Sequence, residues 1–150
     1  MNIIKATLKE KTNTAKLFAE YRLFYGQEYD IAAAETFISK RLVNDDSVIF
    51  LATDGTDYLG FVQLYPSFTS IGVQEIWILN DLFVSEQHRR KGVAEVLIKH
   101  VLQFSNTSKR KKVILSTAYS NSKAQQLYEK LGFKRTEFYN YEKNTNETAD

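Results

Sequence analysis

Three cations and a glycine stand together in the sequence QHRRKGVAEVLI, residues 87–98. The segment before them is rich in β-branched and aromatic residues and predicts a strand, whereas the segment after them repeats apolar residues at helical spacing. Arg89, Arg90, Lys91 and Gly92 are therefore expected in the loop of a strand–loop–helix step. The amides at the first turn of such a helix lack partners within it and can point at one anion. The loop suits a pyrophosphate, although a solvated helix start tolerates the same residues.

Two small residues favour the anion-binding interpretation. Gly92 permits backbone angles that other residues avoid, and it lets a phosphate approach the main chain closely. Ala94 is too small to block that approach, and Arg89 can add charge-assisted hydrogen bonds. No Gly-Lys-Ser/Thr follows, and the three glycines of a dinucleotide fingerprint are absent.

The elements that position this loop follow from apolar periodicity and turn residues. Strands are expected over residues 2–8, 47–53, 58–68, 73–84 and 111–118, with a last strand beginning near Phe133 and running to about 143. Helices are expected from a cap at Thr12 or Asn13 to about 25, then over about 31–43, 93–104 and 121–131. Short turns make neighbouring strands antiparallel, whereas the step from 73 to 118 must be parallel and right-handed. The order predicts a mixed α+β fold.

Composition limits the classes of protein that remain. The 150 residues fit one domain, with 144–150 as a frayed polar tail. A net charge of +2 does not indicate a nucleic-acid or membrane partner. The absence of cysteine excludes disulfides and thiolate metal sites, and the first residues lack the apolar core of a signal peptide. A cytoplasmic protein without a metal is expected.

The loop and a second segment, NSKAQQLYEKLGF, together resemble the GNAT superfamily of N-acetyltransferases. The family's Arg/Gln-x-x-Gly-x-Gly/Ala signature is matched by Arg89, Gly92 and Ala94. Its Asn…Ala-x-x-Leu-Tyr-x-x-x-Gly-Phe pattern is matched by Asn121, Ala124, Leu127, Tyr128, Gly132 and Phe133. The strings EYRLFYGQ, FVQLYPSFTS and WILNDLFV are similar to a branch that contains yeast histone- or polyamine-type acetyltransferase relatives.

The resemblance implies a twisted, mostly antiparallel sheet of about six or seven strands with about four helices, splayed between strands 4 and 5. It implies acetyl-CoA as cosubstrate, an amine acceptor and a homodimer. The break at Asn80-Asp81 fits a bulge, and an amide near Phe83 would polarise the thioester carbonyl. The residues implied to bind the coenzyme are Leu82, Phe83, Val84, Arg89, Arg90, Lys91, Gly92, Val93, Ala94, Glu95, Asn121, Ala124 and Tyr128.

Acetyl transfer to an amine needs an acid and a base. The amine must lose a proton before it attacks, and the departing thiolate is best protonated. Tyr128 matches the family's tyrosine acid. Asp81 is the candidate base, Glu75 is the alternative because a regular strand would place it on the same side, and a water chain can replace both.

Other possibilities stay open at this stage. A CoA-binding module without catalysis and, less favoured, a basic nucleic-acid-binding domain are the rival functions. The basic run SKRKK, residues 108–112, fits a solvated turn, the coenzyme's 3′-phosphate or a nucleic-acid contact. An aromatic acceptor pocket, or simply core, would use Tyr21, Arg22, Tyr25, Tyr65 and Trp77.

Overall fold

The structure is a computed structural model that describes residues 1–146. Residues 1–116 form one compact unit, and a second unit begins at Thr117. The expectation that the whole chain is a single domain stays a prediction. None of the helices in residues 1–146 is both long and apolar enough to cross a membrane.

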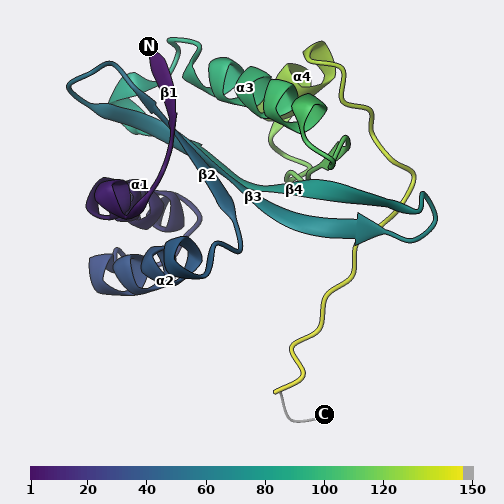
Figure 1. Ribbon diagram of the computed structural model, residues 1–150, viewed down its shortest axis with the longest axis horizontal. Helices are drawn as coiled ribbons and strands as arrows, with labels where there is room; N and C mark the ends of the chain where they lie inside the picture. The colour runs from purple at the N-terminus through teal and green to yellow at the C-terminus, as the bar shows by residue number, and fades with distance from the viewer. Residues whose placement is uncertain (147–150) are drawn as a thin grey trace. The chain divides into compact units, whose positions relative to one another are not determined.

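The first unit is built on a five-stranded sheet in the order β1-β2-β3-β4-β5 (Figure 1). Its strands are β1 (Asn2–Lys5), β2 (Val48–Thr53), β3 (Tyr58–Thr69), β4 (Gln74–Val84) and β5 (Val113–Ile114). Three neighbouring pairs are antiparallel, and only β4 and β5 run parallel. The expected mixed, mostly antiparallel sheet is confirmed.

Helices cover both faces of this sheet (Figure 1). On one face lie α1 (Lys11–Phe24) and α2 (Ile31–Asn44), which share a core with Phe61 and Phe83. On the other lies α3 (Val93–Thr107), packed with Val62, Leu79 and other buried apolar residues. We call these the α1/α2 face and the α3 face.

A 3-10 turn precedes α1, and a side-chain cap starts α2. A 3-10 turn, η1 (Leu8–Glu10), has Thr7 as its cap and leads directly into α1 at Lys11. The predicted cap at Thr12 or Asn13 is therefore wrong, because the turn starts the helix without a side-chain cap. For α2, the Asp30 carboxylate accepts a hydrogen bond from the Ala33 amide at 3.0 Å.

A bulge interrupts β4 where the sequence predicted one. Gln63 on β3 pairs with Asp81, and Leu64 pairs with Leu79, so Asn80 has no counterpart. Because side chains alternate along a strand, one extra residue exchanges the faces of everything beyond it. Asp81 therefore faces α1 and α2, whereas a regular strand would have turned it toward α3.

The sheet opens beyond the start of β5. That strand pairs with β4 only at Trp77↔Val113 and Ile78↔Ile114, although a strand over residues 111–118 was expected. From Leu79 to Val84, β4 has no partner on this side among the strands of residues 1–146. This open edge agrees with the expected splay between strands 4 and 5.

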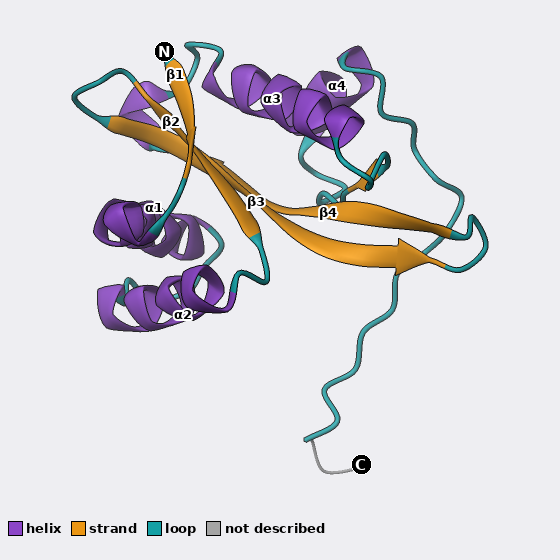
Figure 2. Ribbon diagram, in the orientation of Figure 1, coloured by secondary structure: helices purple, strands orange, loops and turns teal. Residues whose placement is uncertain are grey.

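Within its described residues, 117–146, the second unit contains one helix, α4 (Ser122–Lys130). Asn121 caps it by accepting a hydrogen bond from the Ala124 amide at 3.3 Å, and Gly132 follows with φ +95°. Residues 133–146 form no strand (Figure 2), so five strands are described instead of the predicted six or seven. The side chains of Phe138, Tyr139 and Tyr141 are exposed in this segment. A sequence with strand propensity forms a strand only where a neighbouring strand edge can pair with it. The predicted frayed tail lies mostly outside the described residues.

Candidate active site

The basic loop turns sharply into α3. Arg90 has φ 65° and Gly92 has φ 78°, both in the left-handed region, and α3 starts at Val93 with no side-chain cap. The first helical hydrogen bond runs from the Val96 amide to the Gly92 carbonyl at 3.1 Å. The amides of Val93 and Ala94 thus have no carbonyl partner inside the helix. The helix start has the form that an anion site requires.

The Arg89 side chain contacts β4 and α1. Its Nε donates to the Val84 carbonyl at 3.0 Å, and its guanidinium lies 5.0 Å from the Phe24 ring and 5.5 Å from the Phe83 ring. The side chain therefore braces the loop against β4 and α1. Its expected hydrogen bonds to an anion would have to compete with these contacts, although Arg89, Arg90 and Lys91 are all exposed.

The open edge of β4 offers alternate main-chain groups. The Ser85 amide donates to the Leu59 carbonyl of the neighbouring hairpin at 3.0 Å, so the Val84 carbonyl of the same peptide points away from β3. The main chain of Leu82 and Val84 therefore faces the open edge. The main chain of Phe83 faces β3. A Cβ added to Gly60 of β3 would lie only 2.5 Å from the Phe83 carbonyl oxygen. The Phe83 amide, expected to face the coenzyme, therefore faces β3, and the amides of Leu82 and Val84 face the open edge.

A short hydrogen-bonded bridge supports the loop. Ser85 Oγ lies 2.6 Å from His88 Nδ1, and His88 Nε2 lies 3.9 Å from Asp57 Oδ2. Ser85 is 2% exposed and its hydroxyl also lies within hydrogen-bond distance of the Leu59 carbonyl. A hydroxyl so enclosed cannot reach a substrate, so this arrangement holds the turn before Arg89 and is not a nucleophile site.

Asp81 lies at the bulge in a chain of polar side chains. It is 6% exposed, and its Oδ2 accepts from Gln63 Nε2 at 2.7 Å. Asn80 Nδ2 donates to its Oδ1 at 3.2 Å. On the far side of Gln63, the Ser47 hydroxyl donates to Oε1 at 2.9 Å. The sequence analysis missed Gln63 and Ser47, and the signal was a single amide inside the apolar run YLGFVQLY.

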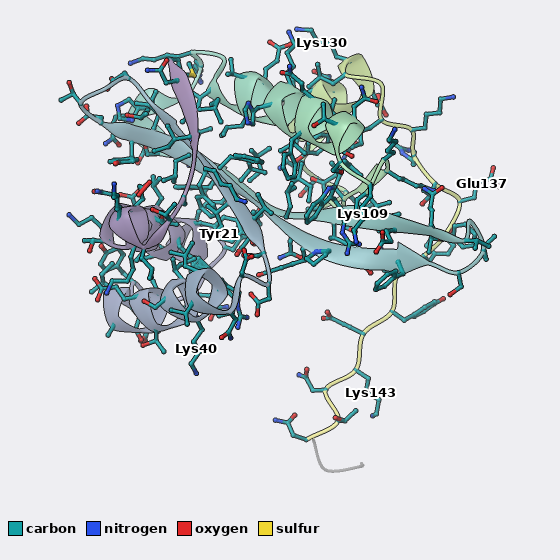
Figure 3. All side chains as sticks on the ribbon, in the orientation of Figure 1. Tyr21, Lys40, Lys109, Lys130, Glu137 and Lys143 are labelled. Atoms are coloured by element: carbon teal, nitrogen blue, oxygen red, sulfur yellow. The ribbon has the colours of Figure 1, made fainter. Side chains whose placement is uncertain are left out.

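Two tyrosines surround this carboxylate on the α1/α2 face. Tyr21 of α1, labelled in Figure 3, packs edge-on against the rings of Phe61 at 5.6 Å and Phe83 at 6.0 Å. Burial raises its pKa well above the ordinary value, and the charge of Asp81 and a hydrogen bond to it raise the pKa further. Burial, then the charge of Asp81, raises the pKa of Tyr65 to about 12. Both phenols therefore remain neutral donors at physiological pH.

Glu75 lies on the opposite face from Asp81. Its Oε1 is 3.4 Å from Lys109 Nζ and 3.6 Å from Arg110 Nη2. The Arg110 guanidinium lies 5.3 Å from the Trp77 ring, which belongs to the α3-face core. The prediction that Glu75 shares a side with Asp81 is wrong, because it assumed a regular strand.

The basic run has a structural task. Arg110 Nη1 donates to the Ser67 carbonyl at 2.7 Å and to the Ile76 carbonyl at 3.3 Å, which joins β3 to β4. Lys109 (Figure 3) is exposed and paired with Glu75. Trp77 is 8% exposed in the core, so it does not line an acceptor pocket.

The second unit carries the tyrosine of the sequence signature. Tyr128 is half-buried on α4, one turn after Ala124 and 5.8 Å from the Phe133 ring. The amide of Phe133 donates to its carbonyl at 3.0 Å. The spacing of Asn121, Ala124 and Tyr128 on one helix is confirmed, whereas their contact with a coenzyme stays a prediction. Residues 1–146 contain no group of three or more His, Asp or Glu side chains able to hold a metal.

Comparison with known proteins gives a consistent result. Residues 14–133 match the Acetyltransferase (GNAT) family. The chain is 39% identical over 142 residues to the uncharacterised N-acetyltransferase YhfO of Bacillus subtilis, covering 94% of this chain and 95% of the relative. It is 30% identical to the D-amino-acid N-acetyltransferase HPA3 of Saccharomyces cerevisiae, covering 84% and 80%. A crystal structure of a probable acetyltransferase superimposes with a TM-score of 0.90 at 40% identity, covering 99% of this chain and all of that one.

The strand–loop–helix step and the open edge of β4 are thus those of an acyl-transfer fold. The chain belongs to the GNAT acetyltransferase family. Its activity is acetyl-CoA-dependent N-acetylation.

Proposed function

We propose that this protein transfers the acetyl group directly from acetyl-CoA to a primary amine of a small molecule or peptide, with both substrates bound together. The observation that carries the proposal is the position of Asp81. The bulge at Asn80 turns this buried carboxylate to the α1/α2 face, directly before Leu82 and three residues before Val84, whose main chains face the open edge.

The residues present fit the coenzyme. The uncapped start of α3 supplies the amides of Val93 and Ala94, and left-handed Gly92 leaves space where a side chain would stand. Exposed Arg90 and Lys91 add positive charge. The main chain of Leu82 and the Val84 amide are suited to pair with an extended amide chain such as pantetheine, whereas the Val84 carbonyl already accepts a hydrogen bond from Arg89. The other proposed contacts are Phe83, Arg89, Glu95, Asn121, Ala124 and Tyr128.

The bound thioester supplies an acetyl group activated toward amines. Asp81 accepts the proton of the attacking ammonium, directly or through one water molecule. The amide of Leu82 or Val84 donates to the carbonyl oxygen as negative charge develops there. Tyr128 gives its phenolic proton to the sulfur as the carbon–sulfur bond breaks and the carbon–nitrogen bond forms, and the second proton lost by the nitrogen restores the phenol through solvent. No metal and no covalent enzyme intermediate take part.

The acceptor pocket favours a small cationic amine. One buried carboxylate attracts an ammonium group, and the rings of Tyr21 and Tyr65 beside it add cation–π attraction. Both D- and L-amino acids are candidate acceptors to be tested, because the yeast relative is named a D-amino-acid N-acetyltransferase. We further propose that the protein is cytoplasmic, which the lack of cysteine supports. We also propose that it is a homodimer, which the family resemblance supports. Neither a membrane nor a nucleic acid is a proposed partner.

A thiol-release assay tests the proposal. The protein is incubated with acetyl-CoA and separate polyamines, D- and L-amino acids, aminoglycosides and basic peptides, and mass spectrometry of the product follows. Thiol release that depends on one class of amine, with one acetyl group added, is the expected result. A thermal shift with coenzyme A but no transfer to any amine would indicate a binding module instead. No thermal shift would contradict the coenzyme site itself.

A further inference from the structure

Gln63 is a fully buried amide in the middle of an otherwise apolar strand. It is 0% exposed, and its neighbours Phe61, Val62 and Leu64 are equally buried. A buried amide destabilises the fold unless its hydrogen bonds are satisfied. Both ends of the Gln63 amide are satisfied, by Ser47 on one side and Asp81 on the other.

The orientation of this amide follows from its partners. A carboxylate only accepts hydrogen bonds, so the NH₂ end of Gln63 must face Asp81 Oδ2, which is 2.7 Å away. The carbonyl end then faces Ser47, whose hydroxyl donates to it at 2.9 Å. A reversed amide would place two oxygens together, so Ser47 and Asp81 allow only one arrangement.

Other polar side chains approach Asp81 from the sheet and from α1. Asn80 donates to its Oδ1 from β4, Tyr21 approaches from α1, and Tyr65 lies nearby on β3. Beyond Tyr65 lie Arg41 of α2 and Asp46, which form an ion pair at 2.9 Å. Gln63 thus donates to Asp81 from the neighbouring strand at 2.7 Å, compared with 3.2 Å for Asn80.

We propose that Gln63 is a positioning residue for the acetyl transfer, and that Ser47 in turn holds Gln63. This inference rests on the proposed role of Asp81 as base. The hydrogen bond to Oδ2 fixes the carboxylate at the bulge, whose extra residue has turned it toward the α1/α2 face. A base held in one orientation keeps its free electron pairs directed at the acceptor amine.

Two substitutions at Gln63 separate positioning from packing. Gln63→Met keeps the volume and removes the donor, and it should lower kcat about tenfold to a hundredfold while the Kd for coenzyme A stays unchanged. Gln63→Glu places a second carboxyl group beside Asp81, so the two share a proton and the acid limb of the kcat/KM profile should move to higher pH. Gln103→Met, on the exposed side of α3, is the matched control.

Three outcomes decide the inference. Wild-type kcat in Gln63→Met, or an unmoved acid limb in Gln63→Glu, would overturn it even if Asp81→Asn is inactive, and the base role of Asp81 would survive. Wild-type turnover in Asp81→Asn would overturn the base role and the inference together. If Gln63→Met does not fold, Ser47→Ala replaces it: lower kcat with unchanged coenzyme affinity supports the inference, and wild-type kcat overturns it.

Discussion

Glu75 and Asp81 lie on the same strand but face opposite sides of the sheet. Glu75 is held by Lys109 and Arg110 on the α3 face, whereas Asp81 is held by Gln63 on the α1/α2 face. The cause is the extra residue at Asn80, which exchanges the two faces of β4 between them. Of the two carboxylates considered as base, the fold thus leaves one beside the tyrosines and ties the other to structural cations.

Replacing Asp81 should therefore affect catalysis much more than replacing Glu75. Asp81→Asn keeps the shape of the side chain and removes its basicity, so kcat/KM should fall by about 10²- to 10⁴-fold. Glu75→Gln should leave kcat/KM near the wild-type value. Initial rates with the best acceptor amine measure both, and circular dichroism confirms folding. The opposite ranking would assign the base to the α3 face.

Tyr128→Phe should lower turnover by about two orders of magnitude, because the departing thiolate loses its proton donor. The affinity for coenzyme A, measured by calorimetry, should remain nearly the same. Tyr141→Phe, at an exposed position of the same unit, serves as control and should be fully active. Unchanged turnover in Tyr128→Phe would remove this residue from the acid role.

Coenzyme binding should depend on Gly92 more than on Lys91. A valine at a φ of 78° costs about 1–3 kcal/mol of backbone strain, which corresponds to roughly a fivefold to hundredfold loss of affinity if the loop rearranges. No atom lies within 4 Å of the missing Cβ, so strain and not collision is the cause.

Two further variants calibrate this comparison. Gly92→Asn should bind coenzyme A better than Gly92→Val, because asparagine tolerates the left-handed region. Lys91→Gln should lose less affinity than Gly92→Val at moderate salt, because screening weakens an exposed charge. A larger loss in Lys91→Gln than in Gly92→Val would make the loop an ordinary charged turn.

Arg110→Ala should destabilise the fold without affecting coenzyme affinity. The substitution leaves the carbonyls of Ser67 and Ile76 without this donor and uncovers the Trp77 ring, so the free energy of unfolding should fall by about 1–3 kcal/mol. Lys111→Ala, exposed in the same run, should leave stability unchanged. Urea unfolding and coenzyme titration separate the two effects. Weaker coenzyme binding with full stability would place Arg110 at the 3′-phosphate instead.

Alkaline pH should destabilise the protein in a way that Tyr21 and Tyr65 control. The pKa of each phenol is raised in the folded state, so above pH 10 the unfolded state loses these protons first and becomes favoured. The stability that the two phenols provide is complete below pH 10, and the part from Tyr65 is lost as the pH passes about 12. Urea midpoints measured from pH 8 to 11 should fall less steeply in Tyr21→Phe and Tyr65→Phe. Identical slopes would show that neither phenol is linked to folding.

Much of the fold was predictable from local sequence. The apolar spacing of Val93, Leu97 and Val101 predicted α3, and the turn at residues 54–57 predicted the antiparallel hairpin of β2 and β3. The break in apolar pattern at Asn80 predicted the bulge. The last strand was not confirmed, because the pattern of residues 133–143 shows strand propensity but cannot supply a partner edge.

The sequence by itself determined which functional residues are present: a glycine able to adopt the left-handed conformation before an apolar helix, a tyrosine one turn after Ala124, and two carboxylates on one strand. These features are local, since helix starts, turns and spacing depend on residues close together in the chain. Only the tertiary structure decided which carboxylate lies beside the tyrosines of the α1/α2 face and which amides face the open edge. Both depend on the register between β3 and β4, and a single unpaired residue changes that register for every position beyond it. The bridge from Ser47, the residue before β2, through Gln63 on β3 to Asp81 on β4 spans 34 residues of the chain, and no spacing along the chain predicts it.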